Sequence, residues 1–386
     1  MSNFVLDRET PPVVGGIDTL YFFADISGDN YNTIYFDKIV KEEFFDGFEF
    51  MGYSGKKSGF VGSWFDYKVQ SDIKVNGKFL DVRLFRVGFK DPTKQTFIKN
   101  VYVQLYAEGI YYYGLEDLLS FIYETFSTYG LVPDEFYVSR ADVNMFVNYD
   151  FSDLKKEMFK VPSRSVEILT NTEITDIDID VPVDSKAKVF FTDRLETLYF
   201  GSRKSDLHFK LYDKFRELGF GNGNFSNKYY IMLSYLRNNG LELMDPLWNL
   251  EFSLKRKALL SYGVDTVSDL LQKAGSIFKD LMHKYVFLGY DVDMIERYRK
   301  SRHLSRLDPH PLWPHLINSY NRYDLVPVKR VLKKYHTDIE RVRTQTIITA
   351  IEDLVYNTGK TPQQIMTDVI LSLERRGTCR TKQQGI

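Results

Sequence analysis

One short segment of the chain alternates apolar residues with side chains that could do chemistry. In residues 207–214, the polar His208, Lys210, Tyr212 and Lys214 alternate with leucine and phenylalanine. Successive side chains of a β-strand point to opposite faces of its sheet. We therefore predict a strand that buries its apolar face and presents these four polar side chains together.

Two further segments repeat this alternation and add carboxylates. Their polar members are Arg140, Asp142 and Asn144 in the first, and Asn249, Glu251, Ser253 and Lys255 in the second. If the three strands are neighbours, one sheet face collects two carboxylates, several cations, a histidine and a tyrosine. Antiparallel sheets often have a solvated, charged face without any activity. The pattern alone thus predicts convergence of these groups, and a merely decorated sheet remains the alternative.

Such a face would suit phosphodiester transesterification. A tyrosine hydroxyl has a pKa of about 10 and is a poor nucleophile at neutral pH, but Lys210 or Lys214 beside it would favour the phenolate. Asp142 and Glu251 could hold a hard divalent cation, Mg²⁺ or Mn²⁺, through oxygen ligands. The cation would polarise the scissile phosphate. Attack by Tyr212 would leave a phosphotyrosine link and a free 3′-hydroxyl.

The elements that must position these groups follow no regular βαβ rhythm. An α+β domain on a central antiparallel sheet, followed by a helical C-terminal region, fits this order. We predict strands at 17–24, 136–147, 187–201, 206–214 and 247–255, and several strands within 56–113 that include a hairpin turn at Asn76-Gly77. We predict helices at 114–129, 151–160 and 266–284 and over most of 290–386.

Three consecutive tyrosines, Tyr111, Tyr112 and Tyr113, fall within the predicted strands. Aromatic side chains can stack on the bases of single-stranded DNA. Tyrosines of a strand more often belong to the sheet surface or the core, and we favour that interpretation.

Composition limits the class of protein. The 386 residues include 44% hydrophobic and 27% charged residues, enough for one large domain or two ordinary ones. The single cysteine, Cys379, excludes an internal disulfide and a cysteine zinc cluster. The start of the chain lacks a signal-peptide pattern, and no window approaches the roughly 18 apolar residues of a membrane helix. We expect a cytoplasmic protein with no membrane partner.

Charge is unevenly distributed along the chain. The formal net charge of −1 is mild evidence against a nucleic-acid-binding protein. From Glu296 to Arg343, however, 12 lysines and arginines face 5 acidic residues. We expect this basic segment to contact DNA phosphates, although a solvated helix face would have the same composition.

The central segments resemble a known family. The run from Tyr199 to Lys214, YFGSRKSDLHFKLYDK, resembles the signature of the Rep_trans replication initiators of rolling-circle plasmids and integrative conjugative elements. The family's arginine–apolar–aspartate run is matched by 140–142, and its tryptophan–glutamate run by Trp248 to Glu251. The resemblance covers roughly 17–290 and is strongest between 140 and 256.

The resemblance implies a central antiparallel nuclease sheet, distantly similar to HUH and RRM domains. The chain has no His-x-His, so the HUH metal motif itself is missing. The family's nucleophile corresponds to Tyr212, and its acidic metal positions to Asp142 and Glu251. The accompanying basic positions correspond to Arg203, Lys210 and Lys214.

The chain also departs from the family pattern. Some members carry a second aspartate where this chain has Phe146, and a second glutamate where it has Ser253. The predicted metal site therefore has fewer carboxylates. Asp150, Asp206 or Asp213 could compensate, although Asp213 has the wrong parity for the polar face.

Together these observations predict a replication initiator with an N-terminal arm (1–16), a nicking domain (17–290) and a basic helical region (291–386). It would nick a locally single-stranded or cruciform site at a double-stranded origin, and remain attached to the 5′ end. The family resemblance implies a homodimer, and its partners would be a helicase and a polymerase of the host. The alternatives are a relaxase of a mobile element and a non-catalytic DNA-binding initiator on the same fold.

Overall fold

The computed structural model divides the chain into two compact units, Met1–Val331 and Leu332–Ile386. Each unit is described by itself. The described residues are 11–26, 29–43, 47–54, 60–94, 99–152, 154, 158–160, 166–169, 197–202, 204–219, 227–242, 246–290, 308–331, 350–351 and 354–375.

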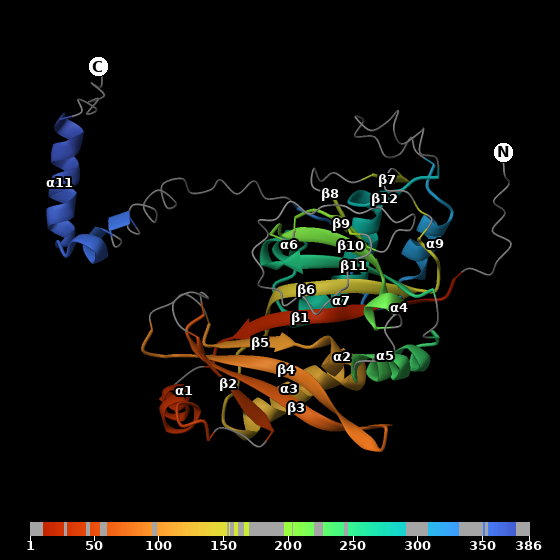
Figure 1. Ribbon diagram of the computed structural model, residues 1–386, viewed down its shortest axis with the longest axis horizontal. Helices are drawn as coiled ribbons and strands as arrows, with labels where there is room; N and C mark the ends of the chain where they lie inside the picture. Colours follow the sequence, from red (N-terminus) through yellow and green to blue (C-terminus); the bar gives the residue numbers. More distant parts are fainter. Residues whose placement is uncertain are drawn as a thin grey trace. The chain divides into compact units, whose positions relative to one another are not determined.

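A ten-stranded antiparallel sheet runs through the first unit in the order β2-β3-β4-β5-β1-β6-β11-β10-β9-β8 (Figure 1). Its strands are β1 (Val13–Ala24), β2 (Phe48–Ser54), β3 (Gly62–Val75), β4 (Lys78–Lys90), β5 (Val101–Leu105), β6 (Tyr137–Val147), β8 (Val166–Leu169), β9 (Thr197–Phe200), β10 (Leu207–Asp213) and β11 (Trp248–Lys255). A small second sheet pairs β7 (Phe159–Lys160) with β12 (Phe287–Leu288). The α+β class with a central antiparallel sheet is confirmed.

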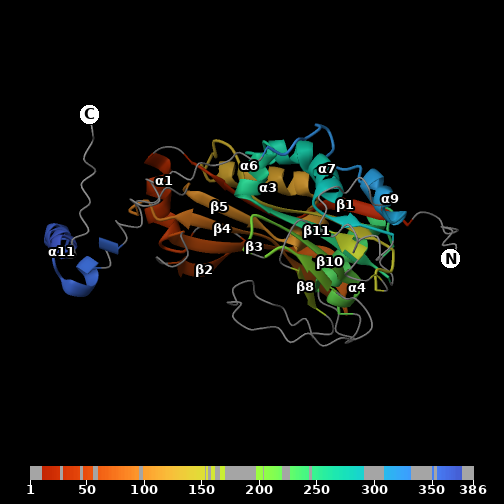
Figure 2. The same ribbon diagram turned by 90° about the horizontal axis from the view of Figure 1, so that it is seen from above.

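The helices lie mainly on one side of this sheet. Figure 2 shows α3 (Leu115–Thr128), α6 (Arg256–Ser261), α7 (Val267–Lys284) and α9 (Leu312–Ser319) along that side. The first unit also holds α1 (Asp29–Ile34), the π-helical turn η1 (Tyr35–Ile39), α2 (Ala107–Tyr113), α4 (Lys214–Glu217) and α5 (Asn227–Asn238). Within the second unit, α11 spans Pro362–Arg375. No described helix is long and apolar enough to cross a membrane.

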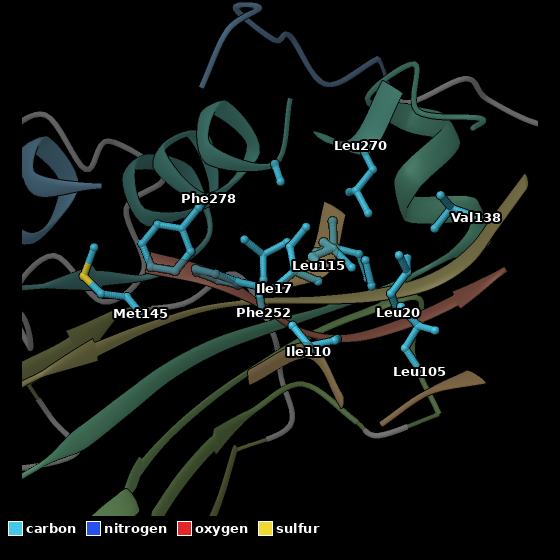
Figure 3. Close-up of a cluster of buried hydrophobic side chains, with 14 of the residues drawn as sticks. Ile17, Leu20, Leu105, Ile110, Leu115, Val138, Met145, Phe252, Leu270 and Phe278 are labelled. Atoms are coloured by element: carbon cyan, nitrogen blue, oxygen red, sulfur yellow. The ribbon is translucent and has the colours of Figure 1, made fainter. Parts of the chain in front are cut away.

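The core forms between the helical layer and the apolar side of the central strands. Phe252 of β11 packs against Phe278 of α7, with ring centroids 5.4 Å apart, and Figure 3 shows both within one cluster of buried side chains. Leu20 of β1 and Val138 of β6 are fully buried in the same cluster. Because strand side chains alternate, residues of the opposite parity on β10, β11, β6 and β1 point away from α7. We call that side the polar face.

Local sequence signals explain several boundaries. Asn76 and Gly77 both have positive φ (51° and 82°), as the predicted two-residue hairpin turn between β3 and β4 requires. Thr266 caps α7 by accepting a hydrogen bond from the backbone of Asp269, whose side chain accepts from the backbone of Thr266 in return. The predicted elements at 136–147, 206–214 and 247–255 are present as β6, β10 and β11, and those at 114–129 and 266–284 as α3 and α7.

The predicted strand at the three tyrosines is wrong. Tyr111, Tyr112 and Tyr113 end helix α2, which takes the place beside β1 where β5 has ended. Gly109 explains the close packing, since a Cβ there would lie 2.6 Å from the carbonyl oxygen of Leu84 in β4. A strand would not require a glycine at position 109, whereas a helix that packs directly on a neighbouring backbone does require one.

Other predictions fit in part. The predicted helix at 151–160 ends instead in strand β7, and 153 and 155–157 lie outside the described residues. Of the predicted strand at 187–201, only β9 is described. Residues 320–331 are irregular rather than helical. The first unit extends to Val331, beyond the boundary predicted at 290/291, and the separate functions predicted for these segments remain predictions.

Candidate functional site

Three neighbouring strands bring the predicted polar side chains together. Lys210 of β10 pairs with Glu251 of β11, which pairs with Asn144 of β6. One step along the same face, Tyr212 pairs with Asn249. The strands are neighbours in the order β6-β11-β10, as the parity argument required.

The hydroxyl of Tyr212 lies at the centre of this cluster. It accepts hydrogen bonds from Asn249 Nδ2 (2.8 Å) and Lys214 Nζ (3.1 Å), and donates one to Glu251 Oε2 (3.3 Å). The ammonium group of Lys210 lies 3.7 Å from the centroid of the tyrosine ring. The side chain of Tyr212 is only 3% exposed. A phenol with a carboxylate acceptor and two lysines beside it is suited to losing its proton.

The surroundings of Tyr212 nevertheless favour the protonated phenol. Burial raises its pKa well above the ordinary value, and the carboxylates of Glu217, Glu251 and Asp18 raise it further. The hydrogen bond from Asn249 acts in the opposite direction. Positive charge brought close to these carboxylates would therefore lower the pKa of the phenol.

Lys214 connects the tyrosine to two residues that the sequence did not single out. It is the first residue of α4, is buried, and forms an ion pair with Glu217. Glu217 also pairs with Lys228 of α5 at 3.5 Å. Burial lowers the pKa of Lys214 to about 8, with Glu217 opposing this shift. For Lys210, burial also acts to lower the pKa, but the carboxylate of Glu251 leaves it above the ordinary value.

Asp142 and Glu251 are diagonal neighbours on the polar face. Asp142 pairs with Ser253, two residues beyond Glu251, and such diagonal positions are about 7 Å apart. Arg140 holds both oxygens of Asp142, with Nη2 at 2.6 Å from one and Nε at 3.1 Å from the other. Asp142 is therefore already neutralised by a guanidinium in this structure.

Asp18 of β1 is the carboxylate that sequence reasoning missed. A β-bulge interrupts the pairing of β1 with β6 between Ile17 and Thr19, and Asp18 is the unpaired residue. Its side chain is buried, and its Oδ1 atom has no hydrogen-bond partner among the described residues. Burial, together with Glu251 and Asp142, raises its pKa well above the ordinary value. The sequence does contain a sign of this bulge. The apolar residues Ile17 and Leu20 are three positions apart, whereas side chains on the same face of a regular strand are separated by an even number of positions.

The residues expected to replace the missing carboxylates lie elsewhere. Asp213 caps the N-terminus of α4, Asp206 is 3.7 Å from Lys257, and Asp150 accepts from the backbone of Ser152. Ser253 is buried, and its Oγ has no hydrogen-bond partner in the described part of the chain. The additional acid is thus supplied by β1.

Position 146, where the family pattern has its second aspartate, holds no carboxylate either. Phe146 is buried and packs 6.0 Å from the ring of Tyr111. An apolar contact with α2 replaces the second aspartate of the family pattern.

The polar face offers few oxygen atoms that could bind a divalent cation. Among the described residues, no group of three or more histidine, cysteine, aspartate or glutamate side chains is arranged to hold a metal ion. The buried oxygen atoms Asp18 Oδ1 and Asn144 Oδ1, however, have no partners within the described residues. Carboxylate and amide oxygens are the ligand types that a hard cation prefers, so the chemistry of these atoms suits such an ion, although Asp18, Asp142 and Glu251 are not grouped around one point in this structure.

Two predicted contributors cannot be placed. Arg203 lies outside the described residues, as do 291–307 and 332–349 of the predicted basic segment. Of the six predicted site residues, the structure brings together Tyr212, Lys210, Lys214, Asp142 and Glu251.

No family model and no curated protein matches the chain. Among solved structures, the chain is similar to a rolling circle replication initiator protein from Geobacillus stearothermophilus, with 13% identity and a TM-score of 0.41. The match covers 81% of this chain and 99% of that one.

Proposed function

We propose that this protein is a replication initiator that nicks one DNA strand by tyrosine transesterification. The observation that carries the proposal is the hydroxyl of Tyr212, which contacts Lys214, Asn249 and Glu251 while Lys210 lies on its ring. A charged sheet surface without any activity would not require a buried phenol with this set of partners. The order of the sequence motifs that resemble Rep_trans initiators agrees with it.

In the proposed reaction, the Tyr212 oxygen forms a bond to the scissile phosphorus. The bond from phosphorus to the 3′ oxygen breaks, and that oxygen takes a proton from solvent and leaves as a 3′-hydroxyl. The phenolic proton passes to Glu251 along the existing hydrogen bond. Lys210, Lys214 and Arg203 bind the phosphate oxygens. The products are a 5′-phosphotyrosyl link and a 3′ end that can prime synthesis.

Asp142 and Glu251, joined by Asp18, would hold Mg²⁺ or Mn²⁺. When bound, such a cation stabilises negative charge on the phosphate oxygens and on the phenolate. It would also neutralise two of the carboxylates that raise the pKa of Tyr212, Glu251 and Asp18. Arg140 would then have to share Asp142 with the cation.

The biological partners follow from this chemistry. The DNA substrate would be an origin with a locally single-stranded or cruciform nick site, and a host helicase and polymerase would extend the 3′ end. A homodimer is the proposed assembly. Relaxase activity at a transfer origin would use the same residues.

A second candidate is a non-catalytic DNA-binding initiator on the same fold. The burial of Tyr212 favours it, because the residue is only 3% exposed and its raised pKa keeps the phenol protonated. The missing second carboxylates at Phe146 and Ser253 favour it too.

The deciding test is covalent adduct formation on a denaturing gel. Purified protein would be mixed with labelled single strands from its own replicon and Mn²⁺ or Mg²⁺. We expect an adduct with the wild type and none with Tyr212→Phe. Tyr199→Phe is the matched control, because Tyr199 pairs with Lys210 on the adjacent strand and its ring also lies near that ammonium group. It should retain the adduct.

Each other outcome has a definite meaning. An adduct that persists in Tyr212→Phe would assign the nucleophile to another residue. DNA binding without any adduct, in the wild type and in both variants, would select the non-catalytic initiator.

A further inference from the structure

A row of aromatic side chains runs across the polar face from β3 to β6, over strands that lie away from β10. Trp64 of β3 pairs with Gly88 of β4, Gly88 pairs with Tyr102 of β5, Tyr102 pairs with Phe23 of β1, and Phe23 pairs with Tyr137 of β6. These rings touch one another: Trp64 and Tyr102 are 6.1 Å apart, and Phe23 stacks on Tyr137 at 5.8 Å. All four aromatic side chains are half-buried.

The rings are fixed by their polar edges. Trp64 donates a hydrogen bond from Nε1 to Ser54 Oγ (2.9 Å), and the hydroxyl of Tyr102 lies 3.1 Å from Ser139 Oγ. At Gly88, a Cβ would come within 2.8 Å of the ring of Phe60 and 3.1 Å of the indole of Trp64. The glycine lets both rings lie close over β4, and the buried Phe60 packs against Trp64 and Tyr102 with centroids 4.9 and 6.3 Å apart. These contacts leave the rings of Trp64 and Tyr102 with little freedom to lose on binding.

Cations accompany this row. Lys99 Nζ lies 4.3 Å from the ring centroid of Tyr137, and the guanidinium of Arg256 lies 5.4 Å from that of Phe23. Next to the aromatic row, a second row across β4, β5, β1, β6 and β11 contains Arg86, Gln104, Tyr21, Arg140 and Lys255. Rings interleaved with cations are typical of surfaces that bind single-stranded nucleic acid.

The two rows lead directly to the candidate site. The guanidinium of Arg140 lies 5.3 Å from the ring centroid of Tyr21 and binds Asp142 at its other side. Tyr21 in turn contacts Tyr102, with centroids 6.3 Å apart. With strands about 4.8 Å apart, β1 lies roughly 14 Å and β5 roughly 19 Å from β10 across the sheet. Tyr212 is level with Val14 of β1, and Tyr21 and Phe23 lie roughly 20–27 Å further along that strand. A DNA strand with one phosphate at Tyr212 therefore has to span roughly 25–30 Å to reach Tyr21 or Phe23.

We propose that Trp64, Tyr102, Tyr21 and Phe23 form a stacking platform for unpaired bases of the DNA strand that is nicked at Tyr212. Aromatic faces stack on bases that have left the duplex, whereas paired bases are already stacked on their neighbours. The platform thus selects a melted substrate over an intact duplex. The identity of the strand rests on the proposed nicking function, while the binding of unpaired bases does not.

The test measures DNA binding without cleavage. Full-length Tyr212→Phe protein in metal-free buffer would be titrated into a labelled 20-nucleotide oligo-dT, and separately into the matching dT·dA duplex. We expect Tyr102→Ala and Trp64→Ala, each added to this background, to weaken single-strand binding by about 5- to 100-fold. Duplex binding should be unchanged. Tyr123→Ala is the control, because Tyr123 is 46% exposed on α3 in the helical layer.

Tryptophan fluorescence provides a direct second readout. Trp248 and Trp313 are 1% and 2% exposed, whereas Trp64 is half-buried. Oligo-dT should quench emission in the Tyr212→Phe protein, and Trp64→Phe should remove most of this quenching while retaining an aromatic ring for binding.

The platform is overturned if Tyr102→Ala and Trp64→Ala, shown to be folded by circular dichroism, bind oligo-dT as tightly as Tyr123→Ala. Equal losses for single strand and duplex would also overturn it, because they would indicate a surface that binds phosphate. Failure of the nicking reaction leaves a different signature, since the adduct would be absent while the platform variants still weaken oligo-dT binding.

Discussion

At the residue scale, the candidate site concentrates carboxylates around a phenol. Asp18 and Glu251 both raise the pKa of Tyr212, and Glu251 also raises that of Asp18. Burying charges of one sign near each other costs free energy unless counter-charges compensate. Lys214 and Lys228 lower the pKa of Asp18 only partly, because burial is the largest cause of its shift. A buried carboxylate held at this cost in stability is a good candidate for a functional role.

We predict that Asp18→Asn stabilises the metal-free protein at pH 7. The variant removes a buried carboxylate that repels Glu251 and Asp142, so the free energy of unfolding should rise by about 1–3 kcal/mol in chemical denaturation with chelator present. It should also abolish any increase in Tm caused by Mn²⁺ in the wild type. Asp37→Asn, at an exposed position of η1, should change neither quantity.

The pH dependence provides an independent check on Asp18. Its folded-state pKa is raised, so between its unfolded value of about 3.9 and its folded value the native state binds more protons than the unfolded state. Its contribution to stability therefore falls as the pH rises through that window. The difference in stability between Asp18→Asn and wild type should grow over the same window. A difference that stays constant with pH would contradict the proposed environment of Asp18.

Parity predicted much of this site but not all of it. Alternation placed Lys210, Tyr212 and Glu251 on one face because β10 and β11 are regular strands in which the rule holds. It missed Asp18 because a bulge breaks the alternation. It missed Glu217 because this residue enters the cluster from α4, where strand parity no longer applies.

At the element scale, regular periodicity was the reliable signal. Strands β6, β10 and β11 and helices α3 and α7 have long patterns with clear end signals, and each lies close to its predicted range. Helix α2 is short and carries consecutive tyrosines, so its own sequence resembles a strand. Its conformation is decided by tertiary contact, since Gly109 lets it lie against Leu84 beside β1.

We predict that Gly109→Ala destabilises the protein by about 1–3 kcal/mol in chemical denaturation. Alanine is the better helix former by about 1 kcal/mol, so local propensity alone predicts the opposite sign. The added Cβ would lie 2.6 Å from the carbonyl oxygen of Leu84 and 2.7 Å from its Cα, and backbone atoms cannot rotate away. Ser120→Ala, at an exposed position of α3, should change stability by less than about 0.5 kcal/mol. A stabilised Gly109→Ala protein would show that α2 does not pack this closely.

At the scale of the whole molecule, the first unit closes its core with residues far apart in sequence. Tyr320 is fully buried, donates a hydrogen bond to the carbonyl of Gly16 (3.0 Å), and stacks on Phe278 at 4.6 Å. Trp313 of α9 is 2% exposed and donates to the carbonyl of Met282 (3.0 Å). The segment that the sequence assigned to a separate basic region thus contributes large side chains to the core of the first unit. Hydropathy could not predict this packing, because the apolar residues of α9 indicate that one face is buried but not which element covers it.

Two truncations should therefore behave differently. A chain ending at Val331 retains every residue of the described core cluster, and we expect its Tm to stay within a few degrees of the full-length value. A chain ending at Tyr290 loses Trp313 and Tyr320, and the loss of two large core side chains should cost several kcal/mol. Calorimetry of both would measure this. If the chain ending at Tyr290 unfolded at the same temperature as the chain ending at Val331, then α9 and Tyr320 would not belong to the core. Adduct formation by the chain ending at Val331 would further show that the chemistry resides in the first unit, and a loss of DNA affinity there would assign phosphate contacts to residues beyond Val331.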